Sequence, residues 1–213
     1  MSVPGPTDER RDRDARTIAV GIVSDNDDPA GMGRVKVSFP WRSVEDESHW
    51  ARIATPMAGA DRGTYFLPEV GDEVLVAFEG GDLGHPYVLG ALWNGEDPPP
   101  AANDDGANDV RTIRSRSGHA LTFDDADDGG VRITTAAGHT IVLDDEPGGE
   151  TMTIADASGS NTIEFDATSN ALSIEAGATL SIEAPEIELT AAGNITIDAA
   201  GVLTLDGALI RLN

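Results

Sequence analysis

Apolar and polar residues alternate along most of the chain, in short segments separated by turn-forming residues. Alternation with a period of two is typical of half-buried β-strands, and no amphipathic helix is recognisable between the segments. The connections between the predicted strands are therefore too short to contain crossover helices. In the first hundred residues the pattern predicts a closed antiparallel barrel of five strands, for which the OB-fold is the leading candidate. The five predicted strand segments, each bounded by Gly, Pro, Asp or Asn, are 17–25, 34–39, 50–57, 72–80 and 86–94.

The second half of the chain is repetitive. SGHALTFDD at 117–125 recurs as AGHTIVLDD at 137–145, and more loosely as SGSNTIEFD at 158–166. Each copy combines a small-residue turn, one short alternating strand and an acidic turn. After residue 171, apolar residues two positions apart recur every 7 or 8 residues. The residues that follow this spacing are Leu172, Ile174, Leu180, Ile182, Ile187, Leu189, Ile195, Ile197, Leu203 and Leu205.

These strands are too short to bury a core of their own. Side chains at i and i+2 face the same side of a strand, so each strand offers one or two apolar groups to an interior. Two architectures bury such groups: a single-chain solenoid, or several chains wound around a common axis. A repeat of 7–8 residues is short for a single-chain coil, although hexapeptide solenoids exist.

The composition divides the chain and restricts its partners. Residues 1–16 are a charged arm, 17–95 the barrel, 96–109 a Pro-rich acidic linker and 110–213 the repetitive region. The net charge is −24, which argues against nucleic acid and anionic membranes as ligands. Lys36 is the only lysine; an acid-rich, lysine-poor surface fits either a high-salt habitat or a GC-rich genome.

Processing signals and disulfide chemistry are missing from the sequence. The chain has no cysteine, so disulfides and thiolate metal sites are excluded. Residues 1–16 have no apolar h-region, and we expect no signal peptide. No stretch approaches the ~20 apolar residues of a membrane span. We therefore expect assembly in the cytoplasm.

Three segments carry a family resemblance: GIVSDNDDPAGMGRVKVSFPW (21–41), WARIATPMAG (50–59) and YFLPEVGDEVLVAFEGGDLGHPYVLGALWN (65–94). They resemble the spike family of contractile tails, namely phage baseplate assembly protein V and the C-terminal part of VgrG spike proteins. The resemblance implies an all-β chain with an OB-fold barrel followed by an intertwined trimeric β-helix, or β-prism, that forms a needle. The ten spaced apolar residues would then be the trimer core. The motif residues of the barrel, which we interpret as structural, are Pro68, Glu69, Gly71, Asp72, Gly81, Asp82 and Pro86.

The resemblance also implies a function and partners. The chain would be the central spike at the baseplate tip of a phage tail, tailocin or extracellular injection particle, and would pierce the target envelope when the sheath contracts. It would bind a separate baseplate hub protein and would meet the target-cell envelope only on firing. A PAAR-type tip protein would cap the C-terminal end at Leu209, Ile210, Leu212 and Asn213.

Catalytic chemistry finds little support in the sequence, and we expect neither an enzyme nor a cofactor. Segment 96–109 is too short to hold the lysozyme domain that some family members carry, and the Asp-Asp pairs lie in predicted turns. No 12-residue calcium loop is present. His119 and His139 occupy equivalent repeat positions; symmetry mates would allow a three-His metal site, but a polar turn role is favoured.

Two other functions remain as alternatives. The first is an OB-fold ligand-binding protein with an adhesive single-chain β-solenoid tail, for which the acidic surroundings of the tryptophans are unfavourable. The second is a cell-wall hydrolase, which lacks a recognisable catalytic domain.

Overall fold

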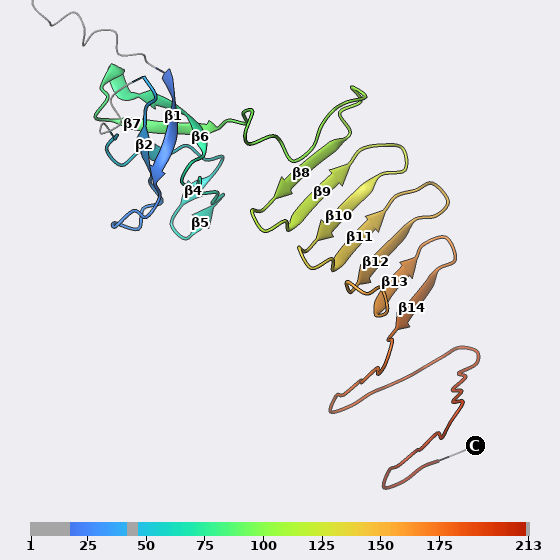
Figure 1. Ribbon diagram of the computed structural model, residues 1–213. Helices are drawn as coiled ribbons and strands as arrows, with labels where there is room; N and C mark the ends of the chain where they lie inside the picture. The colour runs from blue at the N-terminus through green and yellow to red at the C-terminus, as the bar shows by residue number, and fades with distance from the viewer. Residues whose placement is uncertain (1–17, 42–46, 212–213) are drawn as a thin grey trace, which may run out of the picture. The chain divides into compact units, whose positions relative to one another are not determined.

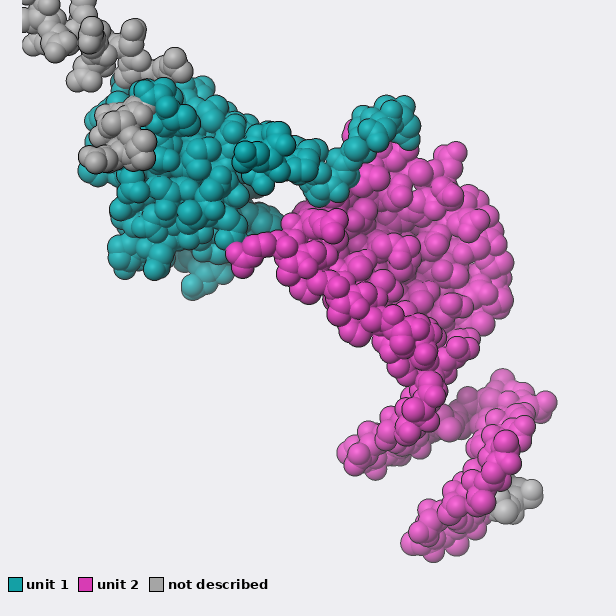
Figure 2. Space-filling model, in the orientation of Figure 1, with its two compact units in different colours: residues 1–106 teal, residues 107–213 magenta. Residues whose placement is uncertain are grey.

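The computed structural model describes residues 18–41 and 47–211. The chain folds as two compact units, residues 1–106 and 107–213, which are described separately (Figure 2). The predicted all-β class is confirmed: the described elements are strands apart from one 3-10 turn, η3 (Glu79–Gly81). No helix in the described part of the chain is long and apolar enough to cross a membrane.

The first unit is a five-stranded sheet that curls toward closure. In the order of the sheet its strands are β2 (Lys36–Ser38), β1 (Ile18–Asp25), β6 (Glu73–Phe78), β7 (Pro86–Ala91) and β3 (Arg52–Ile53). The β2 and β3 ends meet through two backbone hydrogen bonds between Val35 and Ala51, of 3.1 and 2.7 Å. A small hairpin, β4 (Ala58–Gly59) and β5 (Arg62–Gly63), lies outside this sheet.

The expectation of a wholly antiparallel barrel is wrong at one pair. β3 runs parallel to β7, with Arg52 opposite Tyr87 and Ile53 opposite Val88. A parallel pair needs a long connection, and residues 54–85 supply it by way of the hairpin and β6. The predicted strand 50–57 also shrinks to two residues in β3.

Alternation along β1 and β6 builds the core of the first unit. Every second residue of β6 is buried, and β1 follows the same rule until its last residues. Gly21 fills a buried position because β1 approaches β2 closely there: a Cβ on Gly21 would lie 2.3 Å from Val37 Cγ1. The buried apolar residues are Ala19, Val23, Val35, Val37, Phe39, Ala51, Val74, Val76, Phe78 and Val88.

The second unit is an antiparallel meander of seven strands of five residues each (Figure 1). Each strand pairs with the next in the chain, so the sheet grows by one strand at each turn. The strands are β8 (Val110–Arg114), β9 (Ala120–Asp124), β10 (Gly130–Thr134), β11 (Thr140–Asp144), β12 (Thr151–Ala155), β13 (Thr162–Asp166) and β14 (Ala171–Glu175).

The repeat of about 20 residues is therefore a hairpin, and not the single strand that the sequence predicted. The three similar segments form β9, β11 and β13, which run in one direction, and the return strands β10, β12 and β14 lie beside them. Gly118 and Gly138 have φ of 96° and 92° in the turns, a conformation that glycine adopts without strain.

The chain continues beyond Glu175 as an extended trace without strand pairing, as far as residue 211 (Figure 1). The predicted short strands of this segment do not form within one chain. A strand needs a hydrogen-bonded neighbour, and among the described residues of a single chain 176–211 have none arranged as a ladder.

Candidate functional site

One face of the second unit is apolar along its whole length, apart from Arg111 on the first strand. Each strand contributes two residues, two positions apart, which therefore point to the same side of the sheet. The register places these residues directly opposite one another across all seven strands, so that they form two continuous rows. The first row is Ile113, Leu121, Ile133, Ile141, Ile154, Ile163 and Ile174; the second is Arg111, Phe123, Val131, Leu143, Met152, Phe165 and Leu172.

The opposite face is polar. Its central row consists of Thr112, Thr122, Arg132, Val142, Thr153, Glu164 and Ser173. Thr112 and Thr122 hydroxyls lie 3.0 Å apart, and Thr112 also donates to the Leu121 carbonyl at 3.2 Å. The sheet thus has one face suited to water and one suited to burial.

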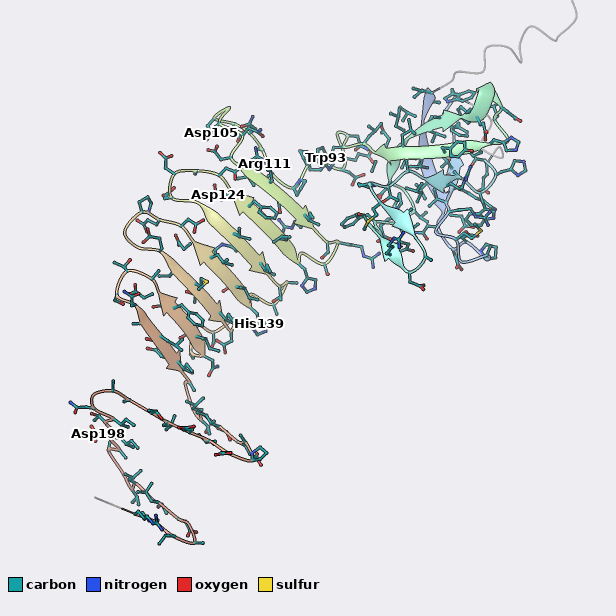
Figure 3. All side chains as sticks on the ribbon, turned by 180° about the vertical axis from the view of Figure 1, so that it is seen from behind. Trp93, Asp105, Arg111, Asp124, His139 and Asp198 are labelled. Carbon is teal, nitrogen blue, oxygen red and sulfur yellow. The ribbon has the colours of Figure 1, made fainter. Side chains whose placement is uncertain are left out.

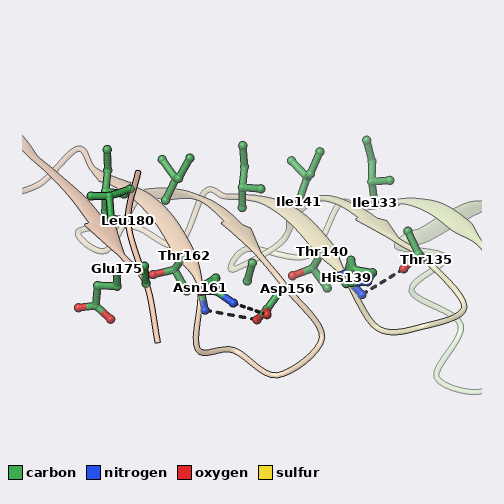
Figure 4. Close-up of a pocket in the computed structure, with 15 residues that line it drawn as sticks. Ile133, Thr135, His139, Thr140, Ile141, Asp156, Asn161, Thr162, Glu175 and Leu180 are labelled. Atoms are coloured by element: carbon green, nitrogen blue, oxygen red, sulfur yellow. Dashed lines mark hydrogen bonds between the residues drawn. The ribbon is translucent and has the colours of Figure 1, made fainter. Parts of the chain in front are cut away.

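The described residues of the chain leave the apolar face uncovered. Ile141, Ile154 and Ile163 lie in central strands, yet are 39%, 47% and 37% exposed. Between the isoleucine row and Leu180 the face is hollowed into a groove of about 550 Å³. Figure 4 shows Ile133 and Ile141 on one side of this sheet and Thr140, Thr162 and Glu175 on the other. A continuous apolar surface of this kind on a folded sheet marks an interface.

The predicted trimer-core residues divide into two sets. Leu172 and Ile174 complete the two rows on β14, and Leu180 lines the groove beside Ile174. The structure does not bring the other seven together, because they lie in the unpaired segment, each 52–73% exposed: Ile182, Ile187, Leu189, Ile195, Ile197, Leu203 and Leu205. Of the predicted tip residues, Leu209 and Ile210 are exposed, while Leu212 and Asn213 fall outside the described residues.

Sequence reasoning missed the part of the apolar face that lies before residue 172. The return strands supply Val131, Ile133, Met152 and Ile154. Their signal in the sequence was a pair of apolar residues two positions apart, the same signal that was recognised after residue 171. Each return strand carries only that one pair, so they were not recognised as strands.

The two histidines lie in turns at one end of the strands, and Asp124 lies at the opposite end (Figure 3 labels His139 and Asp124). His119 Nδ1 accepts a hydrogen bond from the Ala136 backbone N–H at 3.1 Å, and His139 Nδ1 accepts one from Ala157 at 3.2 Å. An Nδ1 that accepts leaves the ring proton on Nε2. Nδ1 of each ring is therefore engaged by a backbone N–H of a neighbouring turn, and the three-His site stays a prediction.

The turn that leads into β6 holds the first half of the barrel motif. Gly71, with φ of 102°, donates its N–H to the Val23 carbonyl at 2.9 Å, and the Val23 N–H donates to the Asp72 carbonyl at 2.9 Å. The Asp72 carboxylate accepts from the Glu69 N–H at 2.9 Å, and the Pro68 carbonyl accepts from Asn26 at 3.0 Å. These contacts fix the turn against the end of β1.

The second half of the motif shapes the connection from β6 to β7. Gly81, with φ of 81°, ends η3, and Pro86 begins β7. The Asp82 carboxylate accepts from the Gly84 N–H at 2.8 Å and lies 2.9 Å from His85 Nδ1. These two bonds lower the pKa of Asp82, the backbone bond most. Motif residues in both turns therefore bond to neighbouring backbone, in arrangements that shape the barrel.

An ion pair closes the loop between β1 and β2. Arg34 donates to both carboxylate oxygens of Asp28, at 2.8 and 2.7 Å, and the backbone N–H groups of Ala30 and Met32 donate to the same carboxylate at 3.0 and 3.1 Å. The Arg34 hydrogen bonds, with smaller help from the backbone, hold the pKa of Asp28 well below its usual range. The Asp28 carboxylate thus holds the loop together by bonding to its side chains and backbone.

Comparison with known proteins matches the first unit to one family. Residues 19–93 match the type VI secretion system/phage-baseplate injector OB domain. The chain is 42% identical over 88 residues to the type VI secretion system spike protein VgrG2a of Pseudomonas aeruginosa, which covers 39% of this chain and 10% of the relative. It is 40% identical over 75 residues to the spike protein VgrG3 of Vibrio cholerae, covering 33% and 7%.

A further Vibrio cholerae relative, the actin cross-linking toxin VgrG1, is 36% identical over 72 residues, covering 32% of this chain and 7% of the relative. The chain therefore matches a tenth or less of the length of these curated relatives.

Proposed function

We propose that the whole chain, whose residues 19–93 match the injector OB domain of type VI secretion systems and phage baseplates, is the central spike of a contractile injection machine. Three copies would assemble with the apolar faces of their second units turned toward a common axis. The observation that carries this proposal is the pair of continuous apolar rows that one chain leaves in water.

The energetics favour assembly over an isolated shaft. Fully burying a Leu or Ile side chain contributes about 1.5–3 kcal/mol, and each strand of the second unit has two apolar side chains to bury, apart from β8 with its Arg111. Ordering the chain costs ~1–2 kcal/mol per residue. An apolar face that stays in water contributes too little free energy to offset this cost. Burial of this face between three chains supplies the stabilisation that a single chain lacks. We therefore expect no stable folded monomer of the shaft.

The segment 176–211 fits the same arrangement. It is extended, its apolar pairs recur every 7 or 8 residues, and it finds no strand partner among the described residues of its own chain. In a trimer the matching segments of two other copies run alongside it and supply backbone partners. The result is an intertwined β-helix with an apolar interior, and a needle in which all three chains resist forced unfolding.

The remaining parts of the proposal concern the ends of the spike. The OB barrel would attach to the baseplate hub, and the exposed Leu209 and Ile210, at 70% and 48%, would receive a PAAR-type tip protein. The sheath would supply the energy, and the spike would transmit it to the target envelope. We assign the chain a mechanical role and no catalytic step.

The single-chain solenoid finds no support in the described strands. A solenoid stacks its coils so that apolar side chains face an interior built by one chain. Strands β8–β14 instead form one antiparallel layer whose apolar face is open. The binding-protein alternative therefore lacks a structural basis in this unit.

The test is the native mass of the purified chain, measured by light scattering in low and high salt. We expect the mass of three 22.2 kDa chains, stable to dilution. Three chains of charge −24 would carry −72, so added salt should favour assembly by screening their repulsion. A monomer at both salt concentrations would overturn the proposal.

A further inference from the structure

Three turns at the same end of the second sheet share one hydrogen-bonding plan. They connect β8 to β9, β10 to β11 and β12 to β13. In each, the first residue donates its backbone N–H to the carbonyl of the last: Ser115 to His119 at 2.8 Å, Thr135 to His139 at 2.9 Å, and Asp156 to Asn161 at 3.1 Å. His119, His139 and Asn161 are thus equivalent positions, each at the end of its turn.

Each of these last residues also accepts a backbone N–H that lies two strands further along the chain. His119 Nδ1 accepts the Ala136 N–H, His139 Nδ1 accepts the Ala157 N–H, and the Asn161 side-chain oxygen accepts the Gly177 N–H, at 3.1, 3.2 and 3.2 Å. These three bonds, called here the staples, join residues 16 to 18 positions apart. Figure 4 places His139 beside Thr135, and Asn161 beside Asp156. The two histidine staples join successive hairpins, and the Asn161 staple joins the last hairpin to the segment after β14. None of the three belongs to the hydrogen bonds between paired strands.

Two of the three staples depend on the protonation state of a histidine. A histidine nitrogen accepts a hydrogen bond only while it carries no proton, and both nitrogens of the charged ring are donors. Imidazole changes charge between about pH 5 and 8. An amide oxygen accepts at every pH in that range. The Asn161 staple therefore differs from the other two in this one respect.

We propose that His119 and His139 make this edge of the second sheet acid-sensitive, tied at neutral pH and opened in acid, while the Asn161 staple holds throughout. The inference goes beyond the proposed spike function, because the staples lie within one chain and do not depend on the number of chains. The tied edge binds fewer protons than the open edge, so its stability is present at higher pH and is lost as the pH falls.

Charged side chains lie near both histidine staples. The turn of His119 contains Arg116 and follows Arg114, and the facing turn 135–139 has His139 as its titratable residue. His139 lines the apolar groove together with Asp156 and Glu175. Carboxylates favour a charged ring and guanidinium groups disfavour it. We therefore expect both histidine staples to open in acid, and the two amides are measured separately.

Asp156 does not titrate in the same range. Hydrogen bonds from the Asn161 and Ser158 side chains, helped by backbone N–H groups, lower the pKa of Asp156 to about 2. The turn that holds Asn161 thus keeps its charge between pH 5 and 8. The Gly177 amide, which is bonded to Asn161, therefore serves as an internal control for the Ala136 and Ala157 amides.

The experiment is amide hydrogen exchange on the full chain in its native assembly between pH 7.5 and 5.0, with rates corrected for intrinsic exchange. Loss of one hydrogen bond corresponds to a change of about 2- to 10-fold in protection. We expect losses of this size at Ala136 and Ala157 in acid, and no change at Gly177. Unchanged protection at both alanines would overturn the proposal.

Two substitutions sharpen the test. His139→Asn supplies the acceptor already found at position 161, so Ala157 should stay protected at both pH values. Asn161→His should transfer acid sensitivity to Gly177. A pH response at Ala157 that survives in His139→Asn would refute the role of the ring. The ¹⁵N chemical shifts of the wild-type histidine rings give a check without mutation. A proton on Nδ1 at pH 7.5 would also refute the proposed acceptor role of the rings.

Discussion

Ile141 on β11 lies directly opposite Ile154 on β12, and both side chains remain in solvent although their strands are central in the sheet. A directly opposed pair of this type contributes roughly 0.2–1 kcal/mol to the pairing of two strands. It leaves the outer surface of both side chains in water. Burial by other chains would gain far more than the pair does alone.

Ile141→Asp should therefore abolish assembly. The substitution places a carboxylate on the apolar face, and in a closed trimer three such charges would be buried without partners, at a cost of several kcal/mol per ion. We expect light scattering to report a single-chain mass in place of three chains.

Val142→Asp is the matched control, since it introduces the same side chain one residue later on the polar face. Its register neighbours are Arg132 and Thr153, and Arg132 offers an opposite charge. This variant should keep the wild-type mass. If both variants behave alike, the apolar face is not the assembly surface.

Gly21→Ala should destabilise the OB barrel. The added Cβ would lie 2.3 Å from Val37 Cγ1, 3.0 Å from the Ser38 carbonyl oxygen and 3.1 Å from a Phe39 ring carbon. Overpacking a core costs about 1–3 kcal/mol, which lowers the melting temperature of a domain this size by on the order of 5 °C or more. Tryptophan fluorescence follows this unit selectively, because Trp41, Trp50 and Trp93 all belong to it.

Gly90→Ala is the control for that experiment. Gly90 also lies in a barrel strand, β7, but a Cβ there meets no atom within 4 Å. Its melting temperature should stay close to that of the wild type. A drop equal to that of Gly21→Ala would point to general strand sensitivity and not to the contact with Val37.

The barrel was the more predictable unit, because its alternation is long enough to be unambiguous. Every second residue is buried over the whole of β6, and the prediction of a strand at 72–80 is confirmed. The shortness of β3 could not be predicted, since only two residues pair with β7 and the neighbouring contacts of Val35 and Ala51 depend on closure of the sheet. The strand pattern made the OB-fold the leading candidate and the resemblance supported it, since alternation alone does not say which strands are neighbours.

The second unit shows where local patterns stop being sufficient. The strands after residue 171 were expected from spacing, yet only β14 forms in one chain. The Asn161 staple was not anticipated, because its acceptor and donor are 16 residues apart and meet only once the register is set. The equivalence of His119 and His139 was visible in the repeat, but their role as acceptors was not.

Asp28→Asn should lower the melting temperature of the barrel at pH 7, because it removes the charge that Arg34 contacts. The pKa of Asp28 is lowered chiefly by its hydrogen bonds with Arg34, so the stabilisation is present above the usual carboxylate pKa of about 3.9. It is lost as the pH falls from there toward the lowered value. Melting curves should show a constant difference between pH 7 and 5, which narrows below about pH 4.

A difference that disappears between pH 7 and 5 would contradict this assignment. Asp25→Asn is a useful comparison, since Asp25 lies at the end of β1 in the same region and, among the described residues, accepts only from the Asp27 N–H, at 2.9 Å. It should have a smaller effect at every pH.

The segment 176–211 should resist proteolysis only when the chains assemble. In one chain it is extended and exposed, with leucines and isoleucines at regular intervals that thermolysin can cleave. Interchain strand pairing would remove the local freedom that cleavage requires. We expect thermolysin to leave wild-type assemblies intact and to cut the Ile141→Asp variant between residues 176 and 211. Mass spectrometry of the fragments identifies the cut sites, and residues 18–93 of the same digest report whether the barrel stayed folded. Rapid cleavage of this segment in a confirmed three-chain assembly would show that the chains meet only through β8–β14, and would remove the intertwined needle from the proposal.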